Sequence, residues 1–312
     1  MNRRDFLKAS AITGAAIVMK PGAAADLMIQ SVQNPATGAG FDLVAIMGGE
    51  PQPMFRQAIA EMGGMRKFIQ PGWQVVVKPN IAWDIIPERA ANTNPELVGD
   101  IVRHCLEAGA REVIVFDHTV DEWRRAYATS GIEAATRAAG GRMMQANQKS
   151  FYRSESLPEG KILKSALFHQ AIVDCDAWIN VPVLKHHSGT HMTIAMKNYM
   201  GIVWDRRFFH WNGLQQCIAD SCTYSKRPVL NIVDAYRVVK ANGPRGRSEA
   251  DVVTPKALFI SQDIVAADTA AARFFNQIRD IPVEMVSHIA KGQALNLGTM
   301  NIDQLSVKRI IL

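Results

Sequence analysis

The alternation of two kinds of apolar pattern constrains what this chain can fold into. From residue 41 onward, short Val- and Ile-rich runs are separated by longer stretches whose apolar positions follow a period of about 3.6 residues. This alternation is typical of strands joined by crossover helices, and continuous apolar runs indicate parallel strands covered on both faces. We therefore predict an α/β fold with a mostly parallel sheet, helices on both faces and a site at the carboxyl ends of the strands.

Turn and capping residues place the elements along the chain. Asn94-Pro95-Glu96 puts a cap residue before a first-turn proline, and Gly109 ends that helix before the next strand. A further helix is predicted from Thr190 to Met200. The stretches 146–160 and 240–254 are polar and turn-rich, which predicts loops that are either lids or plain surface. The predicted strands are 42–47, 74–78, 112–117, 177–184, 229–234, 257–261 and 305–312.

The N-terminus has the features of a twin-arginine export signal. Arg3-Arg4 precedes a mildly apolar run over residues 9–19, which is shorter than the roughly twenty residues of a membrane-spanning helix. Ala23-Ala24-Ala25 predicts cleavage just before Asp26. We therefore predict a signal at 1–25, a flexible lead-in at 26–40 and an α/β domain at 41–312. The expected location is periplasmic or extracytoplasmic after passage through the twin-arginine machinery, with no stable membrane span in the mature chain.

Charge and cysteine usage exclude several classes of protein. The formal net charge is +6, and the signal holds four basic residues and one acidic residue, so about +3 stays with the mature chain. Such a balance does not indicate nucleic-acid binding. The chain has no G-x-S-x-G elbow, P-loop, complete G-x-G-x-x-G or ferredoxin cysteine run, which disfavours the corresponding enzyme and iron-sulfur classes. The cysteines are predicted as buried structural thiols: Cys105, Cys175, Cys217 and Cys222.

Polar side chains follow four of the predicted strands at the point where each strand ends. These are Lys78-Pro79-Asn80, Asp117-His118, Lys185-His186-His187 and Asp234. Ligands of open α/β sheets bind outside the carboxyl ends of the strands, so these side chains are expected to meet at one edge. Each one alone has an ordinary structural explanation, but four together favour a site.

Lysines after buried apolar runs suit the binding of an anion. The ammonium groups of Lys78 and Lys185 would point into the site as compact charges, and burial would lower each pKa toward catalytic use. Lys197 and Asn198 lie about two turns into the predicted helix, where they could face the same cleft. Arg245, within a Gly-Pro-Arg-Gly loop, would add a guanidinium. The predicted ligand is an anionic small molecule such as a carboxylate or phosphate.

The histidines raise the question of a metal. His187 and His191 are four residues apart, as in zinc-binding helices, but the glutamate of H-E-x-x-H is missing and Ser-Gly lies between them. The spacing therefore disfavours zinc. A divalent or redox metal, held by one or two histidines together with an aspartate, remains open; the aspartate candidates are Asp117, Asp220 and Asp234.

Three further polar residues lie outside the strand ends. His210 follows two phenylalanines and either faces the substrate or caps a helix beginning near Asn212. Asp263 is predicted as a helix cap after a strand. Asp268 lies among alanines within that helix, where an unpaired acid is costly. A buried salt bridge, with one of the site lysines as a partner, is the predicted role of Asp268.

Five ordered blocks of the chain, from about residue 42 to about 278, resemble a known family. It is the bacterial and archaeal family called domain of unknown function 362, whose name leaves its general activity open. Some members carry a ferredoxin-type cysteine module; this chain lacks it, so the resemblance does not carry a 4Fe-4S cluster over. The blocks are "PGWQVVVKPNI", "TNPELVGDIVRHCLEAGAREVIVFD", "NVPVLKHHSGTHMTIAMKNYMG", "NIVDAYRVVKANGPRG" and "SQDIVAADTAAA".

The resemblance implies a set of site residues without assigning their chemistry. The usual block has a lysine, one residue and then a histidine, which would align His187, but His186 stays open. The residues of the matching blocks are Lys78, Asn80, Lys185, His186 or His187, Lys197, Asn198, Asp234 and Asp268.

The leading hypothesis is an exported enzyme, with a redox role as one option, that holds a small anion through Lys78, Lys185 and Lys197. One histidine of the 186–187 pair would act as acid/base or metal ligand, and Asp234 would orient a lysine or complete a metal site. The alternative is a non-catalytic periplasmic binding or accessory protein that delivers a cofactor or metal to a respiratory partner. An interaction module is disfavoured, because the polarity lies at strand ends and not on an exposed helix face.

Overall fold

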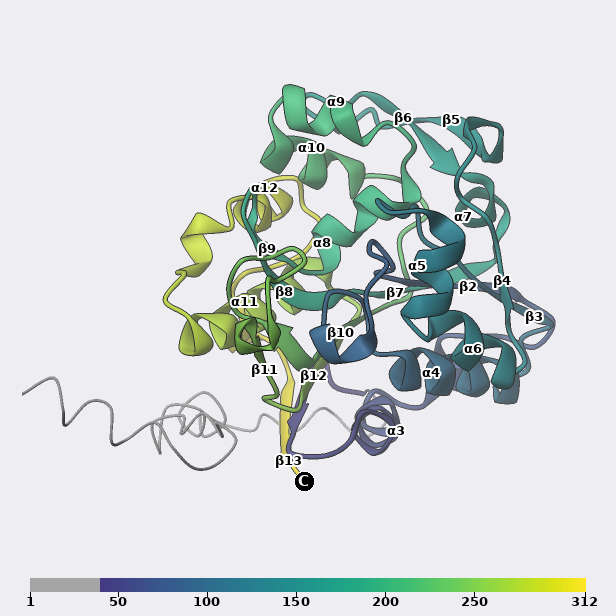
Figure 1. Cartoon of the computed structure of the whole chain (residues 1–312), viewed down its shortest axis with the longest axis vertical. Helices are drawn as coiled ribbons and strands as arrows, with labels where there is room; N and C mark the ends of the chain where they lie inside the picture. Colours follow the sequence, from purple (N-terminus) through teal and green to yellow (C-terminus); the bar gives the residue numbers. More distant parts are fainter. Residues whose placement is uncertain (1–39) are drawn as a thin grey trace, which may run out of the picture.

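The computed structural model describes residues 40–312, whose strands gather mainly in one large sheet with helices on both sides (Figure 1). The predicted signal and lead-in up to residue 39 lie outside the described residues. The strands are β1 (Leu43–Met47), β2 (Gln74–Pro79), β3 (Glu112–Val115), β4 (Arg142–Met143), β5 (Tyr152–Ser156), β6 (Ser165–His169), β7 (Ala177–Val181), β8 (Val183–His187), β9 (His191–Thr193), β10 (Leu230–Val239), β11 (Val252–Val253), β12 (Ala257–Ser261) and β13 (Val307–Ile311).

The helices are mostly short. The α-helices are α3 (Pro51–Glu61), α4 (Pro95–Glu107), α5 (Trp123–Thr129), α6 (Ile132–Ala138), α7 (Gln170–Asp174), α8 (Ala195–Asn198), α9 (Arg206–Trp211), α10 (Leu214–Ser221), α11 (Ile264–Ile278) and α12 (His288–Ala294). The 3-10 turns are η1 (Met65–Lys67), η2 (Pro87–Arg89), η3 (Lys149–Phe151), η4 (Tyr199–Ile202), η5 (Glu249–Asp251), η6 (Val283–Met285) and η7 (Ile302–Gln304). No helix in this part of the chain is long and apolar enough to cross a membrane.

The large sheet is mostly parallel, as the sequence predicts. Its main path runs β13-β1-β12-β10-β7-β2-β3-β4, and only β12 is antiparallel to its neighbours on that path. The predicted strand 177–184 is divided at Pro182, which has no N–H for a ladder. After it, the chain leaves the neighbourhood of β2, and β8 pairs with β10 and with β9. The carboxyl ends of β2, β3 and β8 therefore lie near one another.

Two apolar cores cover the two faces of this sheet. Val76 belongs to one core, whereas Val75 and Val77 belong to the other, because alternate side chains of a strand point to opposite faces. Residues of α8, α10, α11 and α12 pack in the first core, and residues of α3, α4 and α6 pack in the second. Figure 1 shows these two sets of helices on either side of the strands. Burial on both faces explains the continuous valine run.

Capping residues set the starts of the two long helices as predicted. The side chain of Asn94 accepts hydrogen bonds from the N–H groups of Glu96 and Leu97 at 2.9 and 3.4 Å, and Pro95 opens α4. Asp263 accepts in the same way from Val265 and Ala266, both at 2.8 Å. Each cap satisfies N–H groups that the first helical turn leaves without a partner.

The predicted helix from Thr190 to Met200 is wrong over its first half. Residues 191–193 form β9, which pairs antiparallel with β8 after a turn through Ser188-Gly189-Thr190. His191 adopts a positive φ of 64°, which a helix does not tolerate, and β-branched Thr193 lies opposite Lys185 in the hairpin. Only α8 and the 3-10 turn η4 remain helical. Hairpin pairing thus overrides the local helical pattern.

The two predicted loops contain some regular structure. Most of the first, 146–160, is taken up by η3 and β5, and β5 forms a two-stranded sheet with β6. The second, 240–254, contains η5 and the two-residue strand β11 beside β10. Both predictions were therefore correct only in part. Neither segment offers a long apolar run, so its strands depend on pairing with a neighbour.

Candidate anion-binding site

The carboxyl ends of β2, β3 and β8 border a cavity of about 430 Å³. The helices α8 and α9 supply the opposite side. Five basic side chains line this cavity, together with three histidines and one carboxylate. The polar lining residues are Lys78, Asn80, Asp117, His118, Lys185, His187, Ser188, Thr193, Lys197, Asn198, Arg206, Arg207 and His210.

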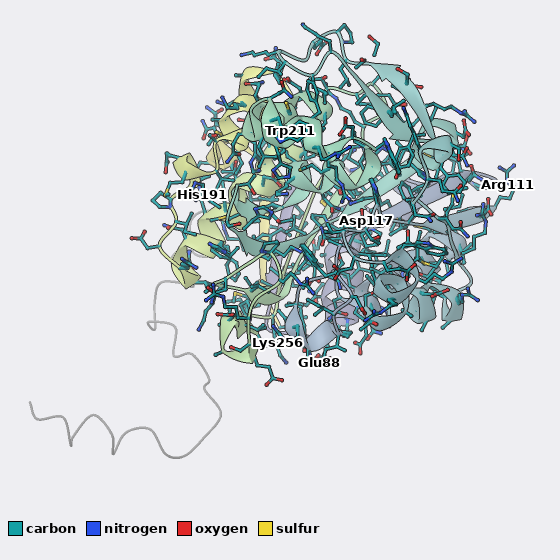
Figure 2. The ribbon with its side chains drawn as sticks, turned by 45° about the horizontal axis from the view of Figure 1, so that its top comes forward. Glu88, Arg111, Asp117, His191, Trp211 and Lys256 are labelled. Atoms are coloured by element: carbon teal, nitrogen blue, oxygen red, sulfur yellow. The ribbon has the colours of Figure 1, made fainter. Side chains whose placement is uncertain are left out.

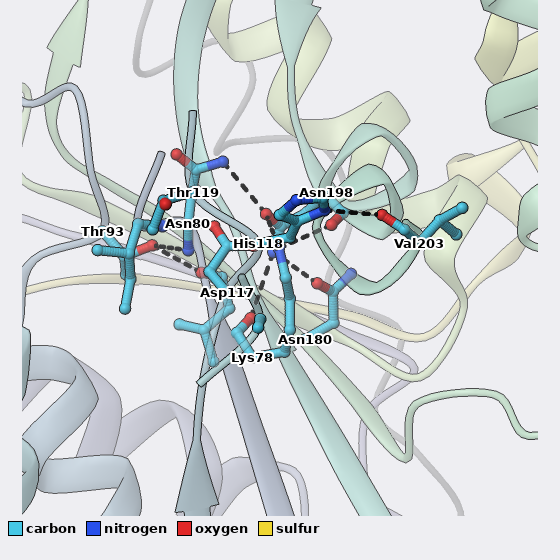
Figure 3. A network of polar contacts seen from close by, with 12 residues as sticks. Lys78, Asn80, Thr93, Asp117, His118, Thr119, Asn180, Asn198 and Val203 are labelled. Atoms are coloured by element: carbon cyan, nitrogen blue, oxygen red, sulfur yellow. Dashed lines mark hydrogen bonds and ion pairs between the residues drawn. The ribbon is translucent and has the colours of Figure 1, made fainter. Parts of the chain in front are cut away.

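Lys78, Asp117 and Asn198 form a buried cluster at the base of the cavity, which we call the floor cluster (Figure 3). Lys78 Nζ lies 2.9 Å from Asp117 Oδ1 and donates to both Asn198 O and Asn198 Oδ1 at 2.7 Å. The ammonium thus has two hydrogen-bond acceptors and one carboxylate as its counter-charge. Burial lowers the pKa of Lys78, and Asp117 opposes that shift. Asp117 lies near the middle of the molecule in the view of Figure 2, and its side chain is buried.

A row of buried asparagines holds the floor cluster in place. Asn198 Nδ2 donates to Asn180 Oδ1 at 2.8 Å and to Lys78 O at 3.2 Å. Asn180 Nδ2 in turn donates to Asn231 Oδ1 and Ala195 O, both at 3.0 Å. These amides connect α8 to β2, β7 and β10. Because buried polar groups are costly unless satisfied, the network favours a single arrangement of these elements.

Gly201 packs directly against the floor cluster. A Cβ atom at this position would overlap Asp117 Oδ1 and Lys78 Nζ, so no larger residue fits while the ion pair is in place. Its carbonyl accepts a hydrogen bond from the N–H of His118 at 3.0 Å, which joins η4 to the end of β3. The absence of a side chain here allows the backbone to approach the buried charges closely.

Lys185 enters the cavity from β8 without a carboxylate partner. Its Nζ donates to Asn80 Oδ1 at 3.0 Å and to the carbonyl oxygen of Ala91. Burial, followed by the nearby charge of Lys197, lowers the pKa of Lys185 to about 7. Asn80 also donates through Nδ2 to Asn198 Oδ1 at 3.2 Å, which links Lys185 to the floor cluster.

Lys197 has the least satisfied ammonium group in the cavity. Its only hydrogen-bond contact within the described chain is to the sulfur of Met200 at 3.5 Å. Burial lowers the pKa of Lys197 to about 8, and the charges of Arg206 and Lys78 act in the same direction. An ammonium with three N–H groups and one weak acceptor has bonds to offer to a ligand.

Arg206 adds a second charge that forms no ion pair within residues 40–312. Its Nη1 and Nη2 donate to the carbonyl oxygens of His118 and Thr119, both at 2.8 Å. Burial lowers the pKa of Arg206. Lys185, Lys197 and Arg206, which we call the wall cluster, therefore present positive charge to the cavity without an acid of their own.

The histidine pair of β8 divides between the two sides of that strand. His187 lines the cavity, two residues from Lys185, whereas His186 does not. His186 Nδ1 accepts from the N–H of Gly243 at 3.0 Å. His187 Nδ1 accepts from the N–H of Gly189 at 3.0 Å, so the proton of the neutral ring is on Nε2. Burial, followed by the charge of Lys197, lowers the pKa of His187 to about 2.

Two other histidines border the cavity. His118 Nδ1 lies 3.0 Å from the carbonyl oxygen of Val203, and its ring stacks on Trp204 with centroids 5.1 Å apart. Burial lowers the pKa of His118 to about 4. His210 lies within α9 and lines the cavity. It does not cap the next helix, because α10 begins at Leu214 with Gly213 as its cap.

Two predicted acidic site residues lie elsewhere. Both oxygens of Asp234 accept backbone N–H groups, from Asn94 at 2.7 Å and from Tyr236 at 3.0 Å, and burial raises the pKa of Asp234 to about 6. Asp234 is absent from the cavity lining, so it neither orients a lysine there nor joins a metal set with His187. The strand does not end at Asp234, as the sequence predicts, but continues to Val239, so Asp234 ties the middle of β10 to Asn94, the cap of α4.

The predicted salt bridge between Asp268 and a site lysine is wrong. Asp268 accepts from the N–H groups of Ala195 at 2.7 Å and Met196 at 3.1 Å, at the start of α8. Its nearest ionisable partner is His288, whose Nε2 lies 3.8 Å from Oδ2. Burial raises the pKa of Asp268 to about 8. The acid therefore anchors the helix that carries Lys197.

Arg245 lies at the cavity rim and not in its lining. Its Nη2 is 3.5 Å from Asp121 Oδ2, and its guanidinium stacks on the ring of Trp83 at 4.9 Å. Half of the side chain is exposed, at 50%. The neighbouring Pro244 and the Trp83 ring, by contrast, do border the cavity.

Sequence reasoning missed the contribution of α9. Arg206 and Arg207 line the cavity from this helix, and Asp205 begins it by accepting from the N–H of Phe208 at 3.3 Å. A basic pair directly before two phenylalanines was the available signal.

The sequence leaves open a metal held by histidines and an aspartate. Among residues 40–312, no group of three or more His, Cys, Asp or Glu side chains is placed to hold a metal ion. Asp220 accepts from the N–H groups of Ile162 and Leu163 at 2.7 and 2.9 Å. All four cysteines are buried and free, as predicted for structural thiols.

Comparisons with known proteins identify sequence relatives. The family model described as domain of unknown function (DUF362) matches residues 75–273, and that of the twin-arginine translocation signal matches residues 1–19. The predicted export signal is thereby confirmed, and it indicates export to the periplasm or another extracytoplasmic space. A thylakoid-associated protein of Synechocystis sp. is 25% identical over 222 residues, which cover 68% of this chain and 66% of that protein, just under two thirds.

Solved structures with a similar fold include an enzyme apoprotein. The lactate racemase apoprotein of Thermoanaerobacterium thermosaccharolyticum aligns with a TM-score of 0.42 and 12% identity, over 72% of this chain and 55% of that one. A likeness of this size carries no argument about activity. The functional interpretation therefore depends on the cavity itself.

Proposed function

The chain belongs to the family of domain of unknown function 362, and from that premise we propose that the exported protein is an enzyme that binds a small organic anion in the cavity and acts on it. Lys197 and Arg206 hold the anion, Lys185 supplies an amine beside it, and His187 contributes a ring N–H.

The observation that supports this function is the excess of cations over carboxylates. Five basic side chains line the cavity, and its one carboxylate, Asp117, already pairs with Lys78. Charges removed from water are costly unless they are paired. A ligand carboxylate or phosphate would supply the missing partner for Lys197, whose ammonium has only a sulfur contact. The anion would thus be bound where the protein leaves its own charge uncompensated.

The cavity also has groups suited to moving protons. A volume of about 430 Å³ is in the range of small-molecule sites. Burial lowers the pKa of Lys185 to about 7, close to the pH at which a general acid or base is most effective. The adjacent His187 stays neutral and can donate through Nε2. Binding and proton transfer are therefore combined in one place, which favours an enzyme over a carrier.

Calorimetric titration of the exported protein tests the proposal. We use oxalate and inorganic phosphate as probes and glycerol as a neutral control of similar size. We expect at least one anion to bind, glycerol not to bind, and the affinity for the anion to fall as salt is raised. In Lys197→Met the anion affinity should fall at least tenfold, which corresponds to about 1.4 kcal/mol.

The matched control is Lys161→Met, which removes an exposed lysine that does not line the cavity. Its anion affinity should equal that of the unmodified protein. The proposal fails if glycerol binds as well as the anions do, or if Lys197→Met and Lys161→Met bind oxalate and phosphate equally.

A further inference from the structure

Two lysines that end strands of the same sheet have different sets of acceptors. Lys78 Nζ donates to two oxygens of Asn198 and forms an ion pair with the Asp117 carboxylate at 2.9 Å, which stabilises the charged ammonium. Lys185 Nζ has two acceptors, Asn80 Oδ1 and the carbonyl of Ala91, and neither is charged. The described residues therefore surround Lys78 with partners suited to a charged ammonium, and Lys185 with acceptors suited to a neutral amine.

A neutral amine at Lys185 would have a free lone pair. It donates two N–H groups, which Asn80 and Ala91 accept, so its remaining tetrahedral position holds the lone pair. Lys185 is only 1% exposed and borders the cavity. Burial and the charge of Lys197 lower its pKa to about 7, so a large fraction is unprotonated at neutral pH. These are the conditions under which a lysine acts as a nucleophile.

We propose that Lys185 Nζ forms an imine with the carbonyl carbon of the bound anion, which makes the substrate class a small carboxylate that also carries an aldehyde or ketone. This inference rests on the proposed function, because Lys197 and Arg206 must hold the carboxylate while the amine reacts. The cavity then recognises two groups on one ligand: a charge and a carbonyl.

The step is balanced without any oxidant or reductant. The Nζ lone pair forms a bond to the carbonyl carbon, and the π electrons move to the oxygen, which receives a proton from the amine. The resulting carbinolamine loses that oxygen as water, together with the second amine proton, and leaves a carbon–nitrogen double bond. His187 lies two residues along β8 on the cavity side and can donate its Nε2–H to the oxygen as charge develops there.

The other cavity lysines fit this role less well. Lys78 is held by Asp117 and both oxygen acceptors of Asn198, which stabilise its charged form. Lys197 has a higher pKa, about 8, and a bound carboxylate would raise it further by stabilising the ammonium. Lys197 is therefore suited to hold the charge, and Lys185 to supply the amine.

Reductive trapping of the exported protein tests the inference. The probe is glyoxylate, the smallest carboxylate with an aldehyde, with sodium cyanoborohydride to reduce any imine; labelled lysines are located by peptide mass mapping. We expect one dominant adduct, on Lys185, with a labelling rate that falls as the pH is lowered through about 7, where the amine becomes protonated. Oxalate should suppress the label, and Lys185→Arg should lose it.

The outcomes separate this inference from the proposed function. If oxalate binds in calorimetry but the label appears on Lys197 or on exposed lysines such as Lys161, the imine is overturned and the anion site stands. If Lys185 is labelled but oxalate does not compete, the link between the amine and the anion site is overturned. Failure of every anion to bind would overturn the proposed function itself.

Discussion

The floor cluster and the wall cluster of the cavity differ in how they satisfy positive charge. In the floor cluster, Lys78 is matched by Asp117 and Asn198, and the amides behind them are also satisfied. In the wall cluster, Lys197 and Arg206 have a sulfur and two carbonyls as partners, and no carboxylate. The comparison teaches that burial of a charge does not by itself indicate function. The missing partner does, because a ligand can supply it.

The largest expected effect is on the floor cluster. Lys78→Met leaves the Asp117 carboxylate buried without its cation, and breaking a buried ion pair in this way costs about 3–5 kcal/mol. We expect the free energy of unfolding to fall by about that amount, measured by urea denaturation with tryptophan fluorescence as the signal.

Two further variants sharpen this result. Lys78→Met combined with Asp117→Asn removes both charges but keeps an oxygen for the N–H of Ile81, so it should recover much of the loss. Gly201→Ala keeps the charges and inserts a methyl group between them, which should cost about 1–3 kcal/mol. A loss below about 1 kcal/mol for Lys78→Met alone would mean that the ion pair is not the structural base of the cavity.

Removal of a charge from the wall cluster should raise the free energy of unfolding, whereas removal of one from the floor cluster lowers it. Burial places the pKa of Lys197 at about 8 in the folded protein, below its usual 10.5. Between pH 8 and pH 10.5 the unfolded chain therefore binds more protons than the folded protein does. The free energy of unfolding consequently rises with pH over this range. Lys197→Met removes this penalty. Without ligand at pH 7, the variant should be more stable than the parent by on the order of 3 kcal/mol, since the pKa falls from 10.5 to about 8 and each pKa unit corresponds to about 1.4 kcal/mol.

The pH dependence is the control for this prediction. The difference in unfolding free energy between Lys197→Met and the parent should shrink as the pH rises from about 8 to 10.5, where both states of the parent lose the proton. Urea denaturation at pH 7 and pH 10 measures it. If Lys197→Met is destabilised at pH 7 as strongly as Lys78→Met, the two clusters do not differ in the way that their contacts indicate.

Most of the fold was predictable because its signals are local. The valines at 75–77 show burial on both faces, and Asn94 and Asp263 form the predicted caps. The strand at 257–261 was predicted with the bounds of β12. Local signals fail where pairing between distant or adjoining segments determines the structure. For example, β9 replaces the first half of a predicted helix because its residues pair with β8.

From the sequence, only the site residues at the carboxyl edge of the sheet could be predicted. Lys78 and Lys185 follow buried runs, and a parallel topology brings their ends together. The choice between His186 and His187 needs the register of β8, and the partner of Asp268 depends on which element packs against α11. The position of Arg206 depends on the path of the chain after η4, which no local pattern encodes. These residues required the structure.

The smallest expected effect concerns Arg245, which the sequence places in the anion site and the structure places at its rim. An exposed ion pair such as Arg245 with Asp121 contributes little, so Arg245→Ala should change the unfolding free energy by no more than about 1 kcal/mol. Its effect on oxalate affinity in calorimetry should be well below that of Arg206→Ala, because solvent screens a half-exposed charge. If both variants weaken oxalate equally, the loop at 243–246 contributes to the anion's binding, and the wall cluster must be extended to include it.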